Sequence, residues 1–424
     1  MKTNPKHPLV VAALIVGVGF ILAGRLAAQT LTTLHDFDET ATSLPWANQN
    51  GAWPTAPVLL EDNLLCGTTA IGGPYGCGII YALRPDGTGF TNLYSFNYAN
   101  TFEQIYLKAG LLSANNLLYG TDCYGGLGYG SVLSIKKQGG AFQILHTFSK
   151  LSYPSPYTNI DGAVPSGELV LAGDTFYGAT AYGGFNDVGT LYAIKTNGTG
   201  FRVLHQFSDS MADGWRPKCT LVLAPAGGTL FGTAENTVFT INTDGSGYRM
   251  LHQFTGGEAA SMMCGLVLSS KGTLYGVTQS SGAADAGRAF AVNTDGSGYR
   301  VLHRFPVTDA ALANVDGAYP VAALILSPQE NILYGTTSGG GVANGGTLFA
   351  LNTDGTGFAV LHDCSTDVGG DNVGGFQPNK LILAGKTLYG TAGWGGQQRR
   401  GYGVQRGPGA FGDYFGEPHP GSNW

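Results

Sequence analysis

Short apolar runs, rich in β-branched and aromatic residues and separated by Gly, Asn and Asp, follow one another along most of the chain. Little helical periodicity is found beyond the N-terminus. Within one stretch four runs lie in succession: ELVLA (168–172), TFYGAT (175–180), TLYAI (190–194) and FRVLHQF (201–207). Runs of this length, bounded by turn residues, predict β-strands. The Asn-Gly step between the last two tolerates positive φ and predicts a tight hairpin turn.

The four-strand pattern is a repeat, because two sequence elements recur in order along the chain. The element that spans the hairpin turn and the fourth strand occurs as RPDGTGFTNLYSF (84–96), KKQGGAFQILHTF (136–148), KTNGTGFRVLHQF (195–207), NTDGSGYRMLHQF (242–254), NTDGSGYRVLHRF (293–305) and NTDGTGFAVLHDC (352–364). The second-strand element occurs as LLCGTT at 64, LLYGTD at 117, TFYGAT at 175, TLFGTA at 229, TLYGVT at 273, ILYGTT at 332 and TLYGTA at 387. Four antiparallel strands in every repeat are typical of a β-propeller blade.

The two ends of the repeat region are complementary. LTTLHDF (31–37) matches only a fourth strand, whereas the last LYGT element (388–391) has no LHxF motif after it. If the N-terminal strand completes the final blade, no sheet edge stays open. The sequence therefore predicts an all-β fold over residues 29–396, a seven-bladed β-propeller of four-stranded antiparallel blades closed by the N-terminal strand.

The N-terminus has the layout of a secretory signal peptide. Lys2 and Lys6 precede an apolar run, Leu9–Ala23, and the small residues Ala27 and Ala28 offer a cleavage site. We therefore expect residues 1–28 to direct export, so that the protein is secreted, periplasmic or at the cell surface. An uncleaved signal anchor is the alternative.

Composition narrows the expected partners. The net charge is −6 and the lysines and arginines are scattered, which argues against nucleic acid and anionic membranes. Six cysteines show no regular spacing and no grouping typical of zinc, although Cys66 and Cys77 could pair across neighbouring strands. The sequence predicts no cofactor and no metal, and we expect a monomer.

Histidine recurs at one place in the repeat. The six copies are His35, His146, His205, His252, His303 and His362, and Tyr94 takes this place in the remaining copy. Blades of a ring hold such residues too far apart for one shared metal or catalytic triad, so a structural hydrogen bond in each blade is the interpretation. The Asp-Gly turns at Asp86, Asp244, Asp295 and Asp354 lack the alternating carboxylates of a calcium loop.

The linked elements LYGTT, Gly-Gly, GTLFALNTDGTGF and LHDF resemble the tandem GloVer repeats of exported bacterial proteins, over roughly residues 31–396. The resemblance implies an exported, propeller-like protein, often attached to the surface by a C-terminal sorting segment, and it implies no catalytic residues. The chain departs from this pattern after residue 396, where residues 397–424 have no strand pattern and no sorting segment. A reading-frame slip is one hypothesis for this irregular tail, because GYGVQRG back-translates, shifted by one base, into ATVFSVD.

Aromatic residues precede a Gly-Gly step in the loop between the second and third strands. They are Tyr124, Tyr182 and Trp394, and Ile71 takes this place in another blade. Such loops lie on one face of a propeller, where aromatic rings could stack on sugars or anchor a protein partner. The alternative is that these rings cover the neighbouring Gly-rich backbone.

A second candidate element leads into the first strand of several blades: NGAWP (50–54), DGAVP (161–165), DGWRP (213–217) and DGAYP (316–320). Asp161, Asp213 and Asp316 would lie near the mouth of the channel and could bind a cation or a polar ligand. An Asp-Gly turn followed by a Pro that fixes the strand start explains the same residues without a ligand.

Motifs of catalysis are absent: the chain contains no GxSxG, HExxH or phosphate loop. We therefore predict a binding or interaction module at the cell surface or outside the cell, with carbohydrate or an extracellular protein as its partner. The alternative is a lyase or hydrolase of extracellular polysaccharide that uses carboxylates in the propeller channel.

Overall fold

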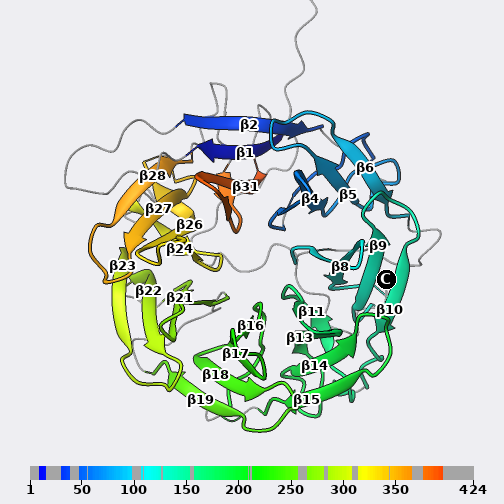
Figure 1. Ribbon diagram of the computed structural model, residues 1–424, viewed down its shortest axis with the longest axis vertical. Coiled ribbons are helices and arrows are strands. Elements are labelled where there is room, and N and C mark those ends of the chain that lie inside the picture. The colour runs from blue at the N-terminus through cyan, green and yellow to red at the C-terminus, as the bar shows by residue number, and fades with distance from the viewer. Residues whose placement is uncertain are drawn as a thin grey trace, which may run out of the picture.

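Figure 1 shows a computed structural model of the chain, in which small sheets are arranged around a central axis. It describes residues 9–15, 30–38, 47–54, 56–97, 107, 109–125, 128–152, 157–208, 210, 213–255, 265–280, 285–307, 314–342, 344–364 and 376–394. Every element within these ranges is a β-strand. The predicted all-β propeller with four-stranded antiparallel blades is confirmed.

Six sheets are formed by strands that follow one another in the sequence. The first two contain β3 (Leu59–Glu61), β4 (Leu64–Thr69), β5 (Ile79–Leu83) and β6 (Thr91–Ser95), then β7 (Leu112–Ala114), β8 (Leu117–Asp122), β9 (Ser131–Lys136) and β10 (Gln143–Thr147). The third contains β12 (Val170–Ala172), β13 (Thr175–Tyr182), β14 (Thr190–Lys195) and β15 (Arg202–Gln206), with β11 (Ala163–Pro165) as an extra short strand.

The next three sheets repeat this order. The fourth contains β16 (Val222–Leu223), β17 (Thr229–Ala234), β18 (Thr237–Asn242) and β19 (Arg249–Gln253), and the fifth contains β20 (Val267–Leu268), β21 (Thr273–Thr278), β22 (Asp285–Asn293) and β23 (Arg300–Pro306). The sixth contains β25 (Ile325–Leu326), β26 (Ile332–Gly341), β27 (Thr347–Asn352) and β28 (Ala359–Asp363), with β24 (Asn314–Pro320) as its extra strand.

A further sheet combines strands from both ends of the chain: β2 (Thr30–Phe37), β1 (Leu9–Ile15), β31 (Thr387–Trp394), β29 (Phe376–Pro378) and β30 (Ile382–Ala384). Leu14 of β1 is opposite both Leu31 of β2 and Leu388 of β31. β1 therefore holds the third-strand place, where the repeat has no sequence of its own after LYGT. Part of the segment that the sequence assigns to a signal peptide, residues 9–15, thus pairs through its backbone with two neighbouring strands.

The hydrophobic core lies between adjacent sheets. One cluster joins Tyr119, Val132 and Phe148 of the second sheet to Phe176 and Tyr192 of the third. The second and third strands of each blade are covered on both faces, which is why their sequences are continuous apolar runs rather than alternating ones.

The glycine of the LYGT element has a packing role. Gly178 on β13 is opposite Tyr192 on β14, and a Cβ at residue 178 would overlap the Tyr192 hydroxyl. The fully buried Tyr192 ring therefore lies directly over a residue without a side chain.

The hairpin turns between third and fourth strands agree with the prediction. The Asp244 carboxylate accepts hydrogen bonds from the Ser246 backbone N–H at 2.8 Å and from the Ser246 hydroxyl at 2.6 Å, and Gly245 has φ +94°. The disulfide between Cys66 and Cys77 that the sequence left open is not formed: both are free thiols, and Cys66 lies within β4 opposite Ala82 whereas Cys77 lies in the following loop. Cys264 and the tail at 397–424 lie outside the described residues.

Candidate functional site on the loop face

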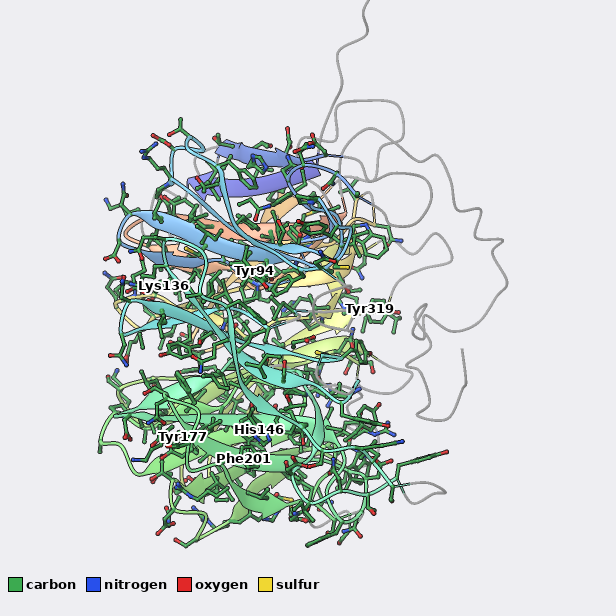
Figure 2. All side chains as sticks on the ribbon, turned by 90° about the vertical axis from the view of Figure 1, so that its right-hand side faces the viewer. Tyr94, Lys136, His146, Tyr177, Phe201 and Tyr319 are labelled. Atoms are coloured by element: carbon green, nitrogen blue, oxygen red, sulfur yellow. The ribbon has the colours of Figure 1, made fainter. Side chains whose placement is uncertain are left out.

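Five of the six repeat histidines stack on an aromatic ring of the next blade. The His146 imidazole stacks on the Phe201 ring of the next sheet at 3.7 Å between centroids (Figure 2), and Phe148 of its own strand meets it edge-on. The same stacking joins the pairs His35–Phe90, His205–Tyr248, His252–Tyr299 and His303–Phe358. The repeated histidines thus contribute packing between blades.

The aspartates of the Asp-Gly-x-x-Pro turns face these histidines. The distance from His Nε2 to the carboxylate is 3.4 Å for His146 and Asp161, 2.9 Å for His205 and Asp213, and 3.3 Å for His303 and Asp316. In the first turn Asn50 takes the same place, with Nδ2 at 3.3 Å from His35 Nε2. The structure therefore brings each predicted aspartate to a repeat histidine rather than to the other two aspartates.

Burial and hydrogen bonds shift the pKa values of Asp161 and His205. Burial raises the pKa of Asp161, but hydrogen bonds from His146 and from the Ser149 backbone and hydroxyl outweigh it and lower the pKa overall. Burial lowers the pKa of His205 despite the neighbouring Asp213 carboxylate. Burial therefore favours the neutral form of the His205 imidazole, whereas hydrogen bonds favour the ionised form of the Asp161 carboxylate.

The Asp-Gly-x-x-Pro turns have an unusual backbone. The residue before the proline has a left-handed conformation in all four copies, with φ +57° at Trp53, +58° at Val164, +51° at Arg216 and +57° at Tyr319. A residue before proline is ordinarily extended, and left-handed φ is costly for a residue with a branched Cβ. Sequence reasoning missed this feature, since nothing in the motif signals it.

The turns and the loops between second and third strands lie together. The Asn159 side-chain oxygen accepts hydrogen bonds from the backbone N–H of Gly162 in the turn and of Gly184 in the loop, both at 2.9 Å. We call the surface formed by these turns and loops the loop face. Tyr319 lies at one edge of the propeller in Figure 2 and marks this face.

The predicted aromatic positions differ in their surroundings. Tyr182 is half-buried and has the Arg216 guanidinium 4.9 Å and the Lys218 ammonium 5.9 Å from its ring centroid. Tyr124 is half-buried, and its backbone N–H donates to the Asp122 carboxylate at 3.1 Å. Trp394 ends β31 opposite Phe376, and its side chain lies outside the described part.

The most exposed apolar side chains of the loop face are at positions that sequence reasoning missed. The exposed fractions are 64 % for Phe185 and 75 % for Val342, which follow Gly-Gly steps, and 69 % for Ile160 and 72 % for Val315, which precede Asp-Gly. The signal was present in the sequence, because each is an apolar residue inside a loop that is otherwise polar and Gly-rich. Phe185 and Ile160 lie beside strands of the third sheet, and Val342 and Val315 beside or within strands of the sixth, so two of the blades carry these exposed side chains.

Within the described residues no group of three or more His, Cys, Asp or Glu side chains could hold a metal ion. The innermost strands border a cavity of about 260 Å³ lined mainly by Pro57, Leu59, Leu111 and Ile382. The Glu168 carboxylate at its wall accepts hydrogen bonds from Lys380 at 2.8 Å to each oxygen. Helices long and apolar enough to cross a membrane are absent from the described ranges.

These features define an all-β propeller repeat protein with a loop face on rigid turns. The chain belongs to the Gloeobacter/Verrucomicrobia repeat family, whose model matches residues 155–314 and 234–404. The repeats described above are thus confirmed as those of this family. No curated protein matches the chain in sequence.

Solved structures with low sequence identity share the fold. An oligogalacturonate lyase from Vibrio parahaemolyticus is 11 % identical with a TM-score of 0.51, over 92 % of this chain and 98 % of the lyase. A GH74 xyloglucanase from Xanthomonas campestris is 15 % identical with a TM-score of 0.50, over 76 % of this chain and 46 % of the xyloglucanase. The extracellular domain of a hybrid two-component system protein from B. thetaiotaomicron is 11 % identical with a TM-score of 0.52, over 82 % of this chain and 38 % of that protein's chain. These similarities concern the fold alone.

Proposed function

We propose that the protein is an exported binding or interaction module that recognises its partner through the loop face, at the cell surface or outside the cell. The observation that carries this proposal is the set of exposed apolar side chains on that face, Phe185, Val342, Ile160 and Val315. Phe185 and Ile160 belong to the third blade and Val342 and Val315 to the sixth, so two blades each present an exposed apolar pair, and exposed apolar side chains within a polar surround are a feature of interaction sites. The partners that fit are a carbohydrate, which stacks on aromatic rings, or an extracellular protein.

The loop face is suited to binding because its backbone is fixed. Asn159 ties a turn to a loop, and Asp161 ties the same turn to Ser149 and faces His146. Rigid loops lose little conformational entropy on binding, so more of the contact energy appears as affinity. The aspartates Asp161, Asp213 and Asp316 therefore act as positioning residues of the face, and Tyr124, Tyr182 and Trp394 remain candidate contacts.

The seven-bladed ring closed by the N-terminal strand is part of the proposal. Phe37 of β2 and Tyr389 of β31 pack in one cluster with Val58 and Leu65 of the first sheet. The Thr391 hydroxyl donates to the Ala56 carbonyl at 3.0 Å, a contact between residues from opposite ends of the chain. Such contacts would keep the loop face continuous around the axis.

Enzymatic action on polysaccharide is the weaker alternative. A catalytic carboxylate pair in the channel should show two acidic groups in one pocket, with shifted pKa values. The acidic group that lines the channel cavity is Glu168, and Lys380 pairs with both of its oxygens. An ion-paired carboxylate is a poor general acid, so binding is the function that this geometry supports better.

A glycan array and a pull-down with the purified chain test the proposal. The test variant is Phe185→Ser with Val342→Ser, which removes two exposed apolar side chains without touching the core. The matched control is Ile144→Ser, because Ile144 is an exposed apolar residue on the outermost strand β10. Binding lost in the first variant and kept in the second supports the proposal; a ligand held equally by both would overturn it.

A further inference from the structure

A positively charged aromatic site lies where the third and fourth sheets meet on the loop face. Tyr182 comes from the end of β13, whereas Arg216 and Lys218 come from the turn that leads to β16. The two cationic groups lie 4.9 Å and 5.9 Å from the Tyr182 ring centroid. Two like charges beside one ring repel each other, so an anion between them would be stabilised.

Arg216 is held in place by its backbone. It has the left-handed φ of +51° described above, and its N–H donates to the Val188 carbonyl of the preceding blade at 2.7 Å. The neighbouring Trp215 is anchored by its indole N–H, which donates to the Glu235 carboxylate at 2.5 Å. A strained backbone conformation that neighbours enforce is a common way of presenting a functional side chain.

The Arg216 guanidinium has no carboxylate partner within the part of the chain that the structure describes. Guanidinium is the group that best matches a carboxylate, because its paired N–H donors bind both oxygens.

From this juxtaposition we infer that the Tyr182–Arg216–Lys218 site binds an acidic polysaccharide through the carboxylate of a uronic acid unit. Arg216 and Lys218 would contact the carboxylate, and the aromatic rings would contact the sugar. Phe185, in the same loop as Tyr182 and 64 % exposed, offers an aromatic surface for the next unit of the chain. The inference rests on the proposed function of the loop face and names its ligand class.

The preceding blade supplies a natural comparison. Its aromatic residue is Tyr124, and the turn that follows carries Val164 and Ser166 where the charged site carries Arg216 and Lys218. Val164 has φ +58°, so the turn accommodates valine at this position in the same backbone conformation. Arg216→Val with Lys218→Ser therefore removes both charges with residues that the fold already accepts.

The test measures binding of polygalacturonate by isothermal titration calorimetry. Three probes are compared: polygalacturonate, neutral dextran and poly-glutamate. We expect polygalacturonate to bind and dextran not to bind. Raising the salt concentration should weaken the affinity, and the Arg216→Val, Lys218→Ser variant should lose about tenfold or more of it.

Each other outcome has a defined meaning. Poly-glutamate binding as tightly as polygalacturonate would overturn the inference in favour of an acidic protein partner. Polygalacturonate binding that survives in the double variant, or dextran binding as well, would overturn the charged site. In these cases the loop face would still bind a ligand, so the proposed function would stand. If the Phe185→Ser, Val342→Ser variant also leaves all binding unchanged, the proposed function itself is contradicted.

Discussion

The imidazole of His205 lies flat against the ring of Tyr248 on the next blade, with 3.9 Å between centroids and 7° between planes. Its Nε2 lies 2.9 Å from Asp213, whose backbone carbonyl accepts the Tyr248 hydroxyl hydrogen bond. One histidine thus joins a fourth strand, the next blade and a turn of the loop face. The same stacking recurs at His35, His146, His252 and His303, which explains why histidine is repeated at this place.

Replacing His205 should weaken the fold. His205→Ala removes the stacked ring and one hydrogen bond of the Asp213 carboxylate, which keeps the one from the Ser208 backbone N–H. Together these losses should lower the free energy of unfolding by about 1–3 kcal/mol. Urea denaturation followed by tryptophan fluorescence measures the change. Tyr248→Ala and the double variant complete a cycle, and strictly additive losses would contradict a direct interaction between the two rings.

Stability should depend on pH through the repeat histidines. Burial lowers the pKa of His35 to about 4 and lowers the pKa of His205, His303 and His362. Between the lowered folded-state pKa values and the unfolded value of about 6.5, the unfolded chain binds more protons than the folded chain. The contribution of these histidines to the free energy of unfolding is therefore fully present above about pH 6.5 and is lost as the pH falls toward the folded-state pKa values. Thermal melts between pH 7.5 and pH 4.5 test this. A midpoint temperature that stays constant over this range would contradict it.

The glycine of the LYGT element should not tolerate a methyl group. Gly178→Ala would force the fully buried Tyr192 ring to move, and overpacking of this kind costs about 1–3 kcal/mol. Gly173→Ala is the matched control, because Gly173 has φ +62° and open space around it, so the cost there is backbone strain of about 1 kcal/mol. Equal losses in both variants would argue against the packing role.

Removal of residues 1–28 should destabilise the sheet that joins the chain ends. Without β1, the edges of β2 and β31 lose their shared partner and stay open to water or to another chain. A chain of residues 29–424 should melt at a lower temperature than the full chain and self-associate at high concentration. Light scattering and thermal melts of the two proteins measure this, and identical behaviour would show that β1 contributes nothing.

Most of the fold could be predicted from the sequence, because each strand is short, apolar and bounded by turn residues. In the third sheet the expected strands at 175–180 and 190–194 correspond to β13 and β14. The place of β1 was not predictable, since the apolar run of Leu9–Ala23 equally suits a signal peptide. The extra strands β11 and β24 were missed because an Asp-Gly-x-x-Pro motif predicts a turn.

The contacts within the candidate site could be predicted from the sequence only in part. The sequence marked Tyr182 and Asp161 through their repeat positions, but a repeat position does not show what a side chain faces. The contact of Asp161 with His146 and that of Arg216 with Tyr182 both cross from one blade to the next. Such contacts depend on how blades pack, which local patterns do not encode.

Hydrogen–deuterium exchange of the protein with and without its captured ligand tests the central claim most directly. If the loop face binds the ligand, protection should appear in the loops around Gly183–Gly184 and Gly340–Gly341 and in the turns around Asp161 and Asp316. The Asp-Gly hairpin turns at Asp244 and Asp295 should exchange as before. Protection confined to those hairpin turns or to the outer strands would contradict the account.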